Sequence, residues 1–263
     1  MKPSLTIIKV GGAVVEDEAQ LTQLLRDFTA IQGPKILVHG GGRRATKIAE
    51  RLGIETKMVD GRRITDADML EVVTMVYGGL VNKNVVARLQ ALGCDAIGLT
   101  GADANILLSH KRPLKMVNGE PVDYGFVGDV KQASGSKIAH FIDADLIPVI
   151  APLTHDGQGH MLNTNADTMA SETAKAMAAV GYDVTLIYAF EKPGVLRDAD
   201  DDNSVITTIN HADFETYKAD GTISGGMLPK IENALAAIDT GVQRVIITKA
   251  TAIDGHHGTM ITD

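Results

Sequence analysis

The chain has no tryptophan, a single cysteine and no excess of basic residues. One cysteine, Cys94, excludes an intramolecular disulfide and a cysteine-rich zinc site, so a buried structural thiol is expected there. The formal net charge of −8 argues against a nucleic-acid surface, which needs a basic face. No apolar run approaches the roughly 20 residues of a membrane span, and no signal-peptide pattern opens the chain. We therefore expect a cytoplasmic protein that holds anionic ligands with local positive groups.

Several motifs of known chemistry are missing as well. The sequence has no G-x-x-x-x-G-K-[ST] phosphate loop, no G-x-G-x-x-G turn and no G-x-S-x-G elbow. The histidines show no metal-ligand spacing, and His256 and His257 are expected at the surface. Residues 197–203 are acidic but do not match a calcium loop, because Asn203 and Ile209 replace the required glycine and glutamate. The sequence thus predicts no resident metal, and a solvated acidic turn at 197–203.

What is present is an alternation of short apolar runs with helical patterns. The 263 residues, 44% of them hydrophobic, suffice for one large α/β domain or two close lobes. Buried strands are expected at residues 6–10, 36–38, 96–99, 146–150, 183–188 and 244–248. The alternation predicts a largely parallel sheet covered by helices on both faces.

Two glycine-rich turns follow the first two expected strands. The first strand carries Lys9 near its end and runs into Gly11 and Gly12. The second ends at His39 and is followed by three glycines at 40–42. Turns between a strand and a helix expose N–H groups that bind anions, and a lysine in an apolar strand needs an anionic partner. Together the turns predict a cradle for a phosphate in transit between two small molecules.

Three later segments bear on the site. A long helix is expected from Thr65 or Asp66, with an apolar stripe and a bend at Gly78–Gly79. Residues 115–122 contain an Asn-Gly pair and predict a hairpin that covers a site as a lid. Thr164 or Asn165 is expected to cap a helix; Asn163 and Asp167, four residues apart, are expected to face one cavity.

Six motifs, in this order, give the sequence a specific resemblance. They are Ile-Ile-Lys-Val-Gly-Gly (7–12), His-Gly-Gly-Gly (39–42), Asp-Gly-Arg-Arg-Ile-Thr (60–65), Gly-Phe-Val-Gly (125–128), Asn-Thr-Asn-Ala-Asp (163–167) and Gly-Gly-Met-Leu-Pro-Lys (225–230). The chain resembles the amino-acid kinase family from residue 4 to about 240. The resemblance implies a three-layer αβα sandwich around a mainly parallel sheet. The pattern is most similar to members that use ATP to phosphorylate the γ-carboxylate of N-acetyl-L-glutamate, in arginine biosynthesis.

The resemblance also implies roles for individual residues. Lys9 and Lys230 flank the transferring phosphoryl group, and Asp167 holds both ammonium groups in place as a structural anion. Arg63 binds the substrate α-carboxylate and Asn163 its acylamino end. The backbone N–H groups expected to bind phosphoryl and carboxylate oxygens are those of Gly11, Gly12, Gly41 and Gly42.

The nucleotide is expected to contact Glu191, Gly226 and Met227, with Glu191 standing where the family has an aspartate. Mg²⁺ is expected to arrive with ATP. Arg62 stands where the family usually has leucine. It is expected either at the solvated surface or at the acyl end of the pocket, where it favours an acyl group with its own carboxylate, as in N-succinyl-L-glutamate.

The resemblance implies two lobes and a dimer. Residues 1 to about 155 are expected to bind the acyl-amino acid and to dimerise, and residues 156–263 to bind ATP. Only three residues precede the first strand, which predicts a homodimer insensitive to arginine. Its candidate dimer face is the apolar stripe Met69, Val72, Val73 and Val76, for which core packing is the competing interpretation.

Two other functions remain open from the sequence. A carbamate, aspartate or uridylate kinase has the same fold, although the segments at 125–128 and 163–167 oppose it. A catalytically dead ligand sensor is the non-enzyme alternative. Retention of Lys9, Asp167 and Lys230 argues against a sensor, which has no need of paired lysines.

Overall fold

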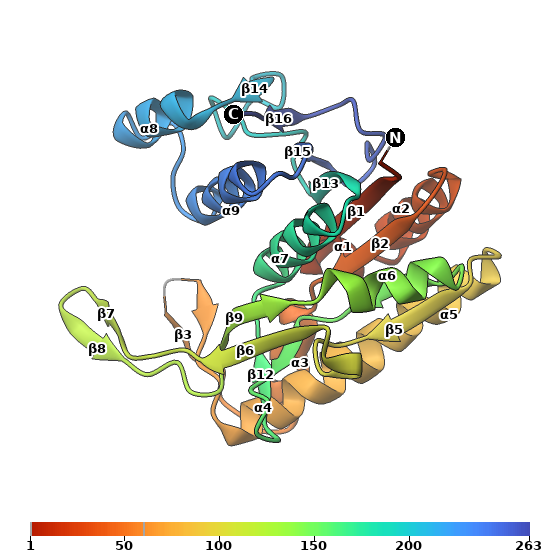
Figure 1. The fold of residues 1–263 in the computed structure, drawn as a ribbon. Helices are drawn as coiled ribbons and strands as arrows, with labels where there is room; N and C mark the ends of the chain where they lie inside the picture. Colours follow the sequence, from red (N-terminus) through yellow and green to blue (C-terminus); the bar gives the residue numbers. More distant parts are fainter. Residues whose placement is uncertain (1, 60) are drawn as a thin grey trace.

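The computed structural model describes residues 2–59 and 61–263, so Asp60 of the 60–65 motif lies outside the described residues. A central eight-stranded sheet has the order β14-β16-β15-β13-β1-β2-β10-β5. Its pairs are parallel except for β15 with β16. Figure 1 shows helices on both sides of this sheet, which confirms the predicted three-layer architecture.

The strands of the central sheet are short and buried. They span β1 (Ser4–Val10), β2 (Lys35–His39), β5 (Ala96–Leu99), β10 (Ile147–Ile150), β13 (Asp183–Phe190), β14 (Thr208–Ile209), β15 (Arg244–Lys249) and β16 (Thr259–Ile261). All six strands expected from apolar runs are present, within one to two residues at each end. The run at β14 is too short to give a pattern.

The two faces of the sheet build separate hydrophobic layers. Leu5 and Ile7 of β1 pack with α7 (Ala166–Ala179) and α9 (Met227–Asp239). Ile8 and Val10, whose side chains point the other way, pack with α2 (Glu18–Ala30) and α5 (Asn82–Ala91). Lys9 has the parity of Leu5 and Ile7, so β1 aims its ammonium group at α7 and α9.

A smaller four-stranded sheet lies beside the central one. It has the order β12-β11-β6-β9 and comprises β6 (Leu107–Lys111), β9 (Gly128–Ala133), β11 (Leu153–His155) and β12 (Met161–Asn163). The predicted hairpin is confirmed as β7 (Lys115–Val117) and β8 (Glu120–Val122), with positive φ at Asn118 and Gly119. Figure 1 shows this hairpin projecting from the body of the protein.

The long helix expected from Asp66 is continuous but changes its winding. It runs through α4 (Ala67–Val73), a π-helical segment (Thr74–Val81) and α5, and Asp66 accepts a hydrogen bond from the N–H of Met69 at 2.9 Å. The glycines at 78–79 lie inside the π-helical segment, where the bend was expected.

The apolar stripe of this helix belongs to the core. Met69, Val72, Val73 and Val76 are at most 2% exposed and pack in one cluster with residues of α3 (Gly42–Arg51) and β11. The stripe is therefore not a free surface in the monomer, and its assignment as the dimer face is corrected. The exposed apolar side chains of this helix are Met75 and Leu80.

The remaining elements are short or peripheral. They are α1 (Gly12–Glu16), α6 (Gly135–Asp143), α8 (His211–Ala219), a 3-10 turn (Asp103–Asn105), β3 (Met58–Val59) and β4 (Arg62–Arg63). Cys94 is buried, and His256, His257 and the acidic turn after Arg197 are exposed, as predicted. Within the described ranges, no helix has the length and apolar character needed to cross a membrane.

Candidate active site

Lys9, Asp167 and Lys230 meet where β1, α7 and α9 come together. The Lys9 Nζ lies 2.8 Å from Asp167 Oδ1, and the Lys230 Nζ lies 3.1 Å from Oδ2. Asp167 is in the first turn of α7, which Asn165 caps by accepting hydrogen bonds from the N–H groups of Asp167 and Thr168. Lys230 is in the first turn of α9. The structure thus brings together the three residues predicted to be catalytic.

The carboxylate is ionised in spite of its burial. Burial opposes the charge of Asp167, but the ammonium groups of Lys9 and Lys230 outweigh it and lower its pKa to about 2. Burial lowers the pKa of Lys230, and repulsion from Lys9 lowers it further against the attraction of Asp167. With two cations on one anion, the cluster carries one net positive charge.

Aromatic rings surround the Lys230 ammonium group. It lies 5.3 Å from the centre of the Tyr188 ring and 5.9 Å from that of Phe190, both on β13. The Tyr188 hydroxyl donates to the backbone oxygen of Asp167 at 3.3 Å, and Tyr188 pairs in register with Lys9. These contacts hold Lys230 and the start of α7 against β13, the strand that pairs with β1.

The two glycine-rich turns pack backbone against backbone. A Cβ on Gly40 would lie 2.9 Å from Gly12 N, and one on Gly12 would lie 3.4 Å from Gly41 N. Gly12 begins α1 and Gly41 caps α3, so the close packing of the turns brings two helix N-termini together. A side chain at Gly40 would collide with the facing turn, so the absence of a side chain permits this packing.

One of the four glycines does not have the predicted role. The N–H of Gly11 donates to Ala189 O on β13 at 3.2 Å. It is used to join the turn to the sheet, so the expectation that it binds a phosphoryl oxygen is corrected.

A cavity of about 200 Å³ opens beside the glycine turns and ends at the N-terminus of α7. Among the described residues its lining includes three arginines and no acidic side chain. Lining residues that carry the argument are Gly41, Gly42, Arg62, Arg63, Arg112 and Asn163. The cavity therefore suits a small anionic molecule.

Arg63 is a buried cation with neutral partners. Its Nη2 donates to Gly42 O and Thr46 Oγ1, both at 2.9 Å, and its Nη1 donates to Thr56 Oγ1 at 3.2 Å. Within the described part of the chain no carboxylate pairs with it. A guanidinium group that is 8% exposed and lacks an anion is favoured to bind a carboxylate from the cavity.

Asn163 and Val127 of the 125–128 motif also line this cavity. Asn163 donates from Nδ2 to Thr65 Oγ1 at 2.9 Å, and its N–H donates to Phe126 O at 2.9 Å. Gly125 has a φ of +70° and lies directly against the carbonyl of Thr65, leaving no room for a side chain. Asn163 lines the cavity as predicted, whereas Asp167 lies just beyond the lining.

Two cavity residues escaped the sequence analysis. Arg112 pairs through Nε and Nη2 with the carboxylate of Asp129, and Tyr77 packs against Gly41 from the π-helical segment. The motifs do not predict that Arg112 or Tyr77 lines the cavity. The end of β6, which precedes Arg112, and the π-helical segment reach the cavity only through tertiary packing. Arg112 stands just before a proline that ends the strand pattern, which is a weak signal.

A second cavity of about 170 Å³ lies before α9. Met227, Val195, Leu196 and Ile223 give it an apolar lining, and Lys192 is at its edge. Met227 is the first residue of α9 and Gly226 is its N-cap. Glu191 is exposed and lies 3.7 Å from Arg43 Nη1.

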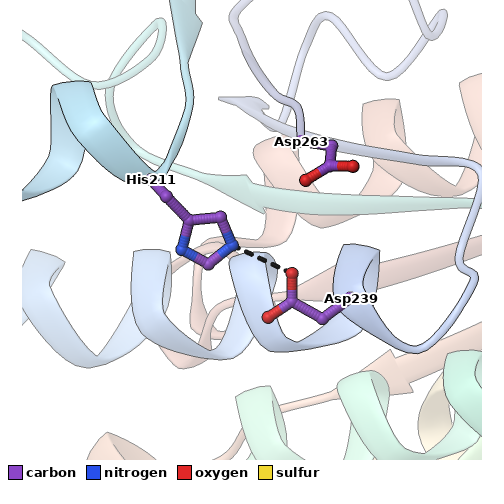
Figure 2. A group of neighbouring side chains, drawn as sticks. All are labelled: His211, Asp239 and Asp263. Carbon is purple, nitrogen blue, oxygen red and sulfur yellow. Dashed lines mark hydrogen bonds and ion pairs between the residues drawn. The ribbon is translucent and has the colours of Figure 1, made fainter.

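A cluster of three possible metal-ligating side chains, shown in Figure 2, lies at the surface away from the cavities. His211 Nε2 is 2.9 Å from Asp239 Oδ1, and one ligand atom each of His211, Asp239 and Asp263 lies within 4.8 Å of the others. All three residues are exposed and far apart in sequence, so no motif predicts the group. Such groups are common on protein surfaces, and we assign no ion to it.

The sheet, the interlocked glycine turns and the lysine–aspartate–lysine cluster define an α/β protein that holds phosphoryl groups of small molecules. The chain belongs to the amino acid kinase family, whose sequence profile matches residues 4–249. It is 63% identical over 261 residues to the acetylglutamate kinase of Bacteroides fragilis, which covers 99% of this chain and 98% of that protein.

Solved structures share the fold. The protein smu.665 from Streptococcus mutans is 28% identical, with a TM-score of 0.77 over 98% of both chains. N-acetylglutamate synthase from Neisseria gonorrhoeae is 20% identical, with a TM-score of 0.81 over 100% of this chain and 60% of that one. The second likeness concerns the fold alone. The family and fold predicted from the six motifs are confirmed.

Proposed function

We propose that this protein transfers the γ-phosphoryl group of ATP to the γ-carboxylate of N-acetyl-L-glutamate. The observation that carries the proposal is the Lys9–Asp167–Lys230 cluster beside a cavity lined by arginines, in a chain 63% identical to an acetylglutamate kinase. The product is an acyl phosphate, as expected for a step of arginine biosynthesis.

The two lysines act on the phosphoryl group in transfer. Their ammonium groups offset the charge that spreads over its oxygens as the bond to ADP breaks and the bond to the carboxylate forms. The nucleophile is a carboxylate that is ionised at neutral pH, so the reaction needs no general base. Asp167 is occupied by both lysines and positions them.

Each polar group of the substrate has its own binding residues. Its γ-carboxylate and the phosphoryl group that it receives face the N–H groups of Gly12, Gly41 and Gly42. Its α-carboxylate pairs with Arg63, and its acylamino end contacts Asn163. Orientation of the two reactants in this way contributes up to about 7–11 kcal/mol to lowering the barrier. Apart from Asn163, the residues proposed to bind the acyl-amino acid lie within residues 1 to about 155, which supports the proposal that this part binds it.

The nucleotide occupies the C-terminal part, residues 156–263. The apolar cavity before α9 suits the base, and the N-terminus of α9 with Gly226 and Met227 suits the phosphates. No acidic residue of the described chain lines the main cavity, and the carboxylate of Asp167 is taken by lysines. Mg²⁺ would then come with ATP, bound to its phosphates, and would supply charge neutralisation there. Glu191 stays a candidate for a nucleotide contact.

One observation favours a second substrate, N-succinyl-L-glutamate. Arg62 lines the cavity beside Arg63, at the position where the family usually has leucine, whereas Arg112 of the same lining is paired with Asp129. A succinyl group adds one carboxylate at the acyl end, where a charged hydrogen bond contributes about 1.5–3 kcal/mol.

The test is ADP release measured in parallel with N-acetylglutamate, N-succinylglutamate, glutamate, aspartate and carbamate. We expect turnover with the acylated glutamates alone. If none of the five compounds supports turnover while ATP or an amino acid still binds, a ligand sensor is favoured. Comparing kcat/KM for the two acyl forms in native protein and in Arg62→Leu then tests the acyl end. If the native enzyme prefers acetyl and the leucine variant keeps the same ratio, Arg62 takes no part in acyl recognition.

A further inference from the structure

His39 is a buried titratable residue that the phosphoryl-transfer scheme does not use. It is the last residue of β2 and is 0% exposed. Its Nδ1 lies 2.9 Å from Gly40 O, and its Nε2 lies 3.1 Å from Asn82 Nδ2. Burial is the main cause that lowers the pKa of His39 to about 4; the hydrogen bond to Gly40 opposes the shift, and nearby Lys83 adds to it. The ring is therefore neutral at pH 7.

The partners fix which ring nitrogen carries the proton. A carbonyl oxygen only accepts, so Nδ1 bears the hydrogen and donates to Gly40 O. The Asn82 amide nitrogen only donates, so Nε2 accepts from it. The same Asn82 nitrogen donates to Val149 O at 2.9 Å, and Asn82 Oδ1 accepts from Lys83 Nζ at 3.1 Å. His39 is thus held in one tautomer and one orientation by α5.

Holding the Gly40 carbonyl sets the direction of the next N–H group. In a planar trans peptide the C=O of one residue and the N–H of the next point in opposite directions. Because Gly40 O points to His39, the N–H of Gly41 points away from it, to the side of the turn opposite α5. Gly41 lines the cavity, and its nitrogen lies 3.4 Å from the position of a Cβ on Gly12.

Backbone hydrogen bonds hold the turn on either side of the peptide that joins Gly40 to Gly41. The N–H of Gly40 donates to Val10 O at 2.9 Å, and Gly41 O accepts from the N–H of Ala45 at 3.0 Å. Neither bond uses the Gly40 carbonyl or the Gly41 N–H, and glycine residues by themselves set little preference for the orientation of that peptide. The hydrogen bond from His39 restrains the following peptide, which carries the donor that faces the cavity.

We propose that His39, supported by Asn82, is a positioning residue that aims the Gly41 N–H at the transferring phosphoryl group. The proposal rests on the proposed kinase function. A preorganised N–H stabilises the charge that develops in the transition state, and loss of one such donor reduces kcat by about 10²–10³-fold.

The test compares three variants with native protein. His39→Leu removes the donor and keeps an apolar side chain; we expect kcat to fall by at least about 10-fold, with KM for both substrates changed less than threefold. His39→Asn keeps a donor nitrogen near the position of Nδ1 and should recover most of kcat. Val85→Ala, a buried change on α5 away from the turn, lowers the melting temperature and leaves kcat near the native value.

A structural role alone would give a different pattern. His39→Leu would then resemble Val85→Ala, with a lower melting temperature and native kcat, and the proposal would be overturned. Failure of Asn to restore more kcat than Leu overturns it as well. If His39→Leu does not fold, Asn82→Leu serves in its place, with the same split between kcat and KM expected. Absence of turnover in the native protein rejects the kinase function itself, which keeps the two failures distinct.

Discussion

Replacement of Asp167 by asparagine tests the charge cluster most directly. The change keeps the shape of the side chain and leaves two buried ammonium groups without their anion. At an effective dielectric constant of about 20, each contact of roughly 3 Å attracts by about 5 kcal/mol, and the two ammonium groups repel each other once the anion is removed. Desolvation offsets much of this, and breaking such a buried pair costs about 3–5 kcal/mol.

The pKa of Asp167 gives a second estimate. A value of about 2 in place of 3.8 corresponds to roughly 2–3 kcal/mol of unfolding free energy. Because the folded pKa is the lower one, this contribution is present above about pH 4 and is lost as the pH falls through about 2. The two estimates meet at about 3 kcal/mol.

The assay is urea unfolding at pH 7 together with steady-state kinetics. We expect Asp167→Asn to lose at least about 2 kcal/mol of unfolding free energy and kcat to fall on the order of 10²-fold, since the lysines separate. Glu172→Gln, on the same helix in a partly buried pair with Lys175, is the control; it should lose less unfolding free energy than Asp167→Asn, because its carboxylate pairs with one lysine and not two. A loss in Asp167→Asn no larger than in this control would refute the reasoning.

Three further predictions concern the same molecule. Lys9→Ala and Lys230→Ala should each reduce kcat far more than they raise KM, because their charges act in the transition state; steady-state kinetics that show an effect on KM alone would contradict this role. Gly40→Ala should destabilise the protein by about 1–3 kcal/mol in urea unfolding, since its Cβ would lie 2.9 Å from Gly12 N, whereas Gly79→Ala has open space and should be tolerated. We expect a homodimer in sedimentation and a shift towards monomer in Met75→Asp, because Met75 is 55% exposed; a monomeric native protein would contradict the first part.

Much of the fold followed from the sequence because local and global signals agree. The run at residues 4–10 is apolar on both faces, so it forms a strand in any context that buries it, and period two then places Lys9 with Leu5 and Ile7. The caps at Asp66 and Asn165 also act within one turn of chain. Such local rules are insensitive to the rest of the molecule.

The errors lie where one chemical pattern has two possible uses. An apolar stripe such as Met69, Val72 and Val73 is the same whether it faces the core or a second subunit, and α3 with β11 decides for the core. An N–H group such as that of Gly11 is free or used according to the neighbouring strand, and β13 uses it. These outcomes depend on contacts between elements far apart in sequence.

The site concentrates positive charge in a chain whose net charge is −8. The electrostatic field of the whole chain repels the anions ATP and acylated glutamate, so their binding depends on positive charges close to the site. The cluster of Lys9, Asp167 and Lys230 keeps one positive charge after its internal pairing, and Arg63 contributes a cation with neutral partners. Asp167 thereby has two effects. It offsets the repulsion between two adjacent ammonium groups, and it leaves the N–H donors that it does not use available to the phosphoryl oxygens. The aspartate with one lysine alone would leave no net charge for the transition state.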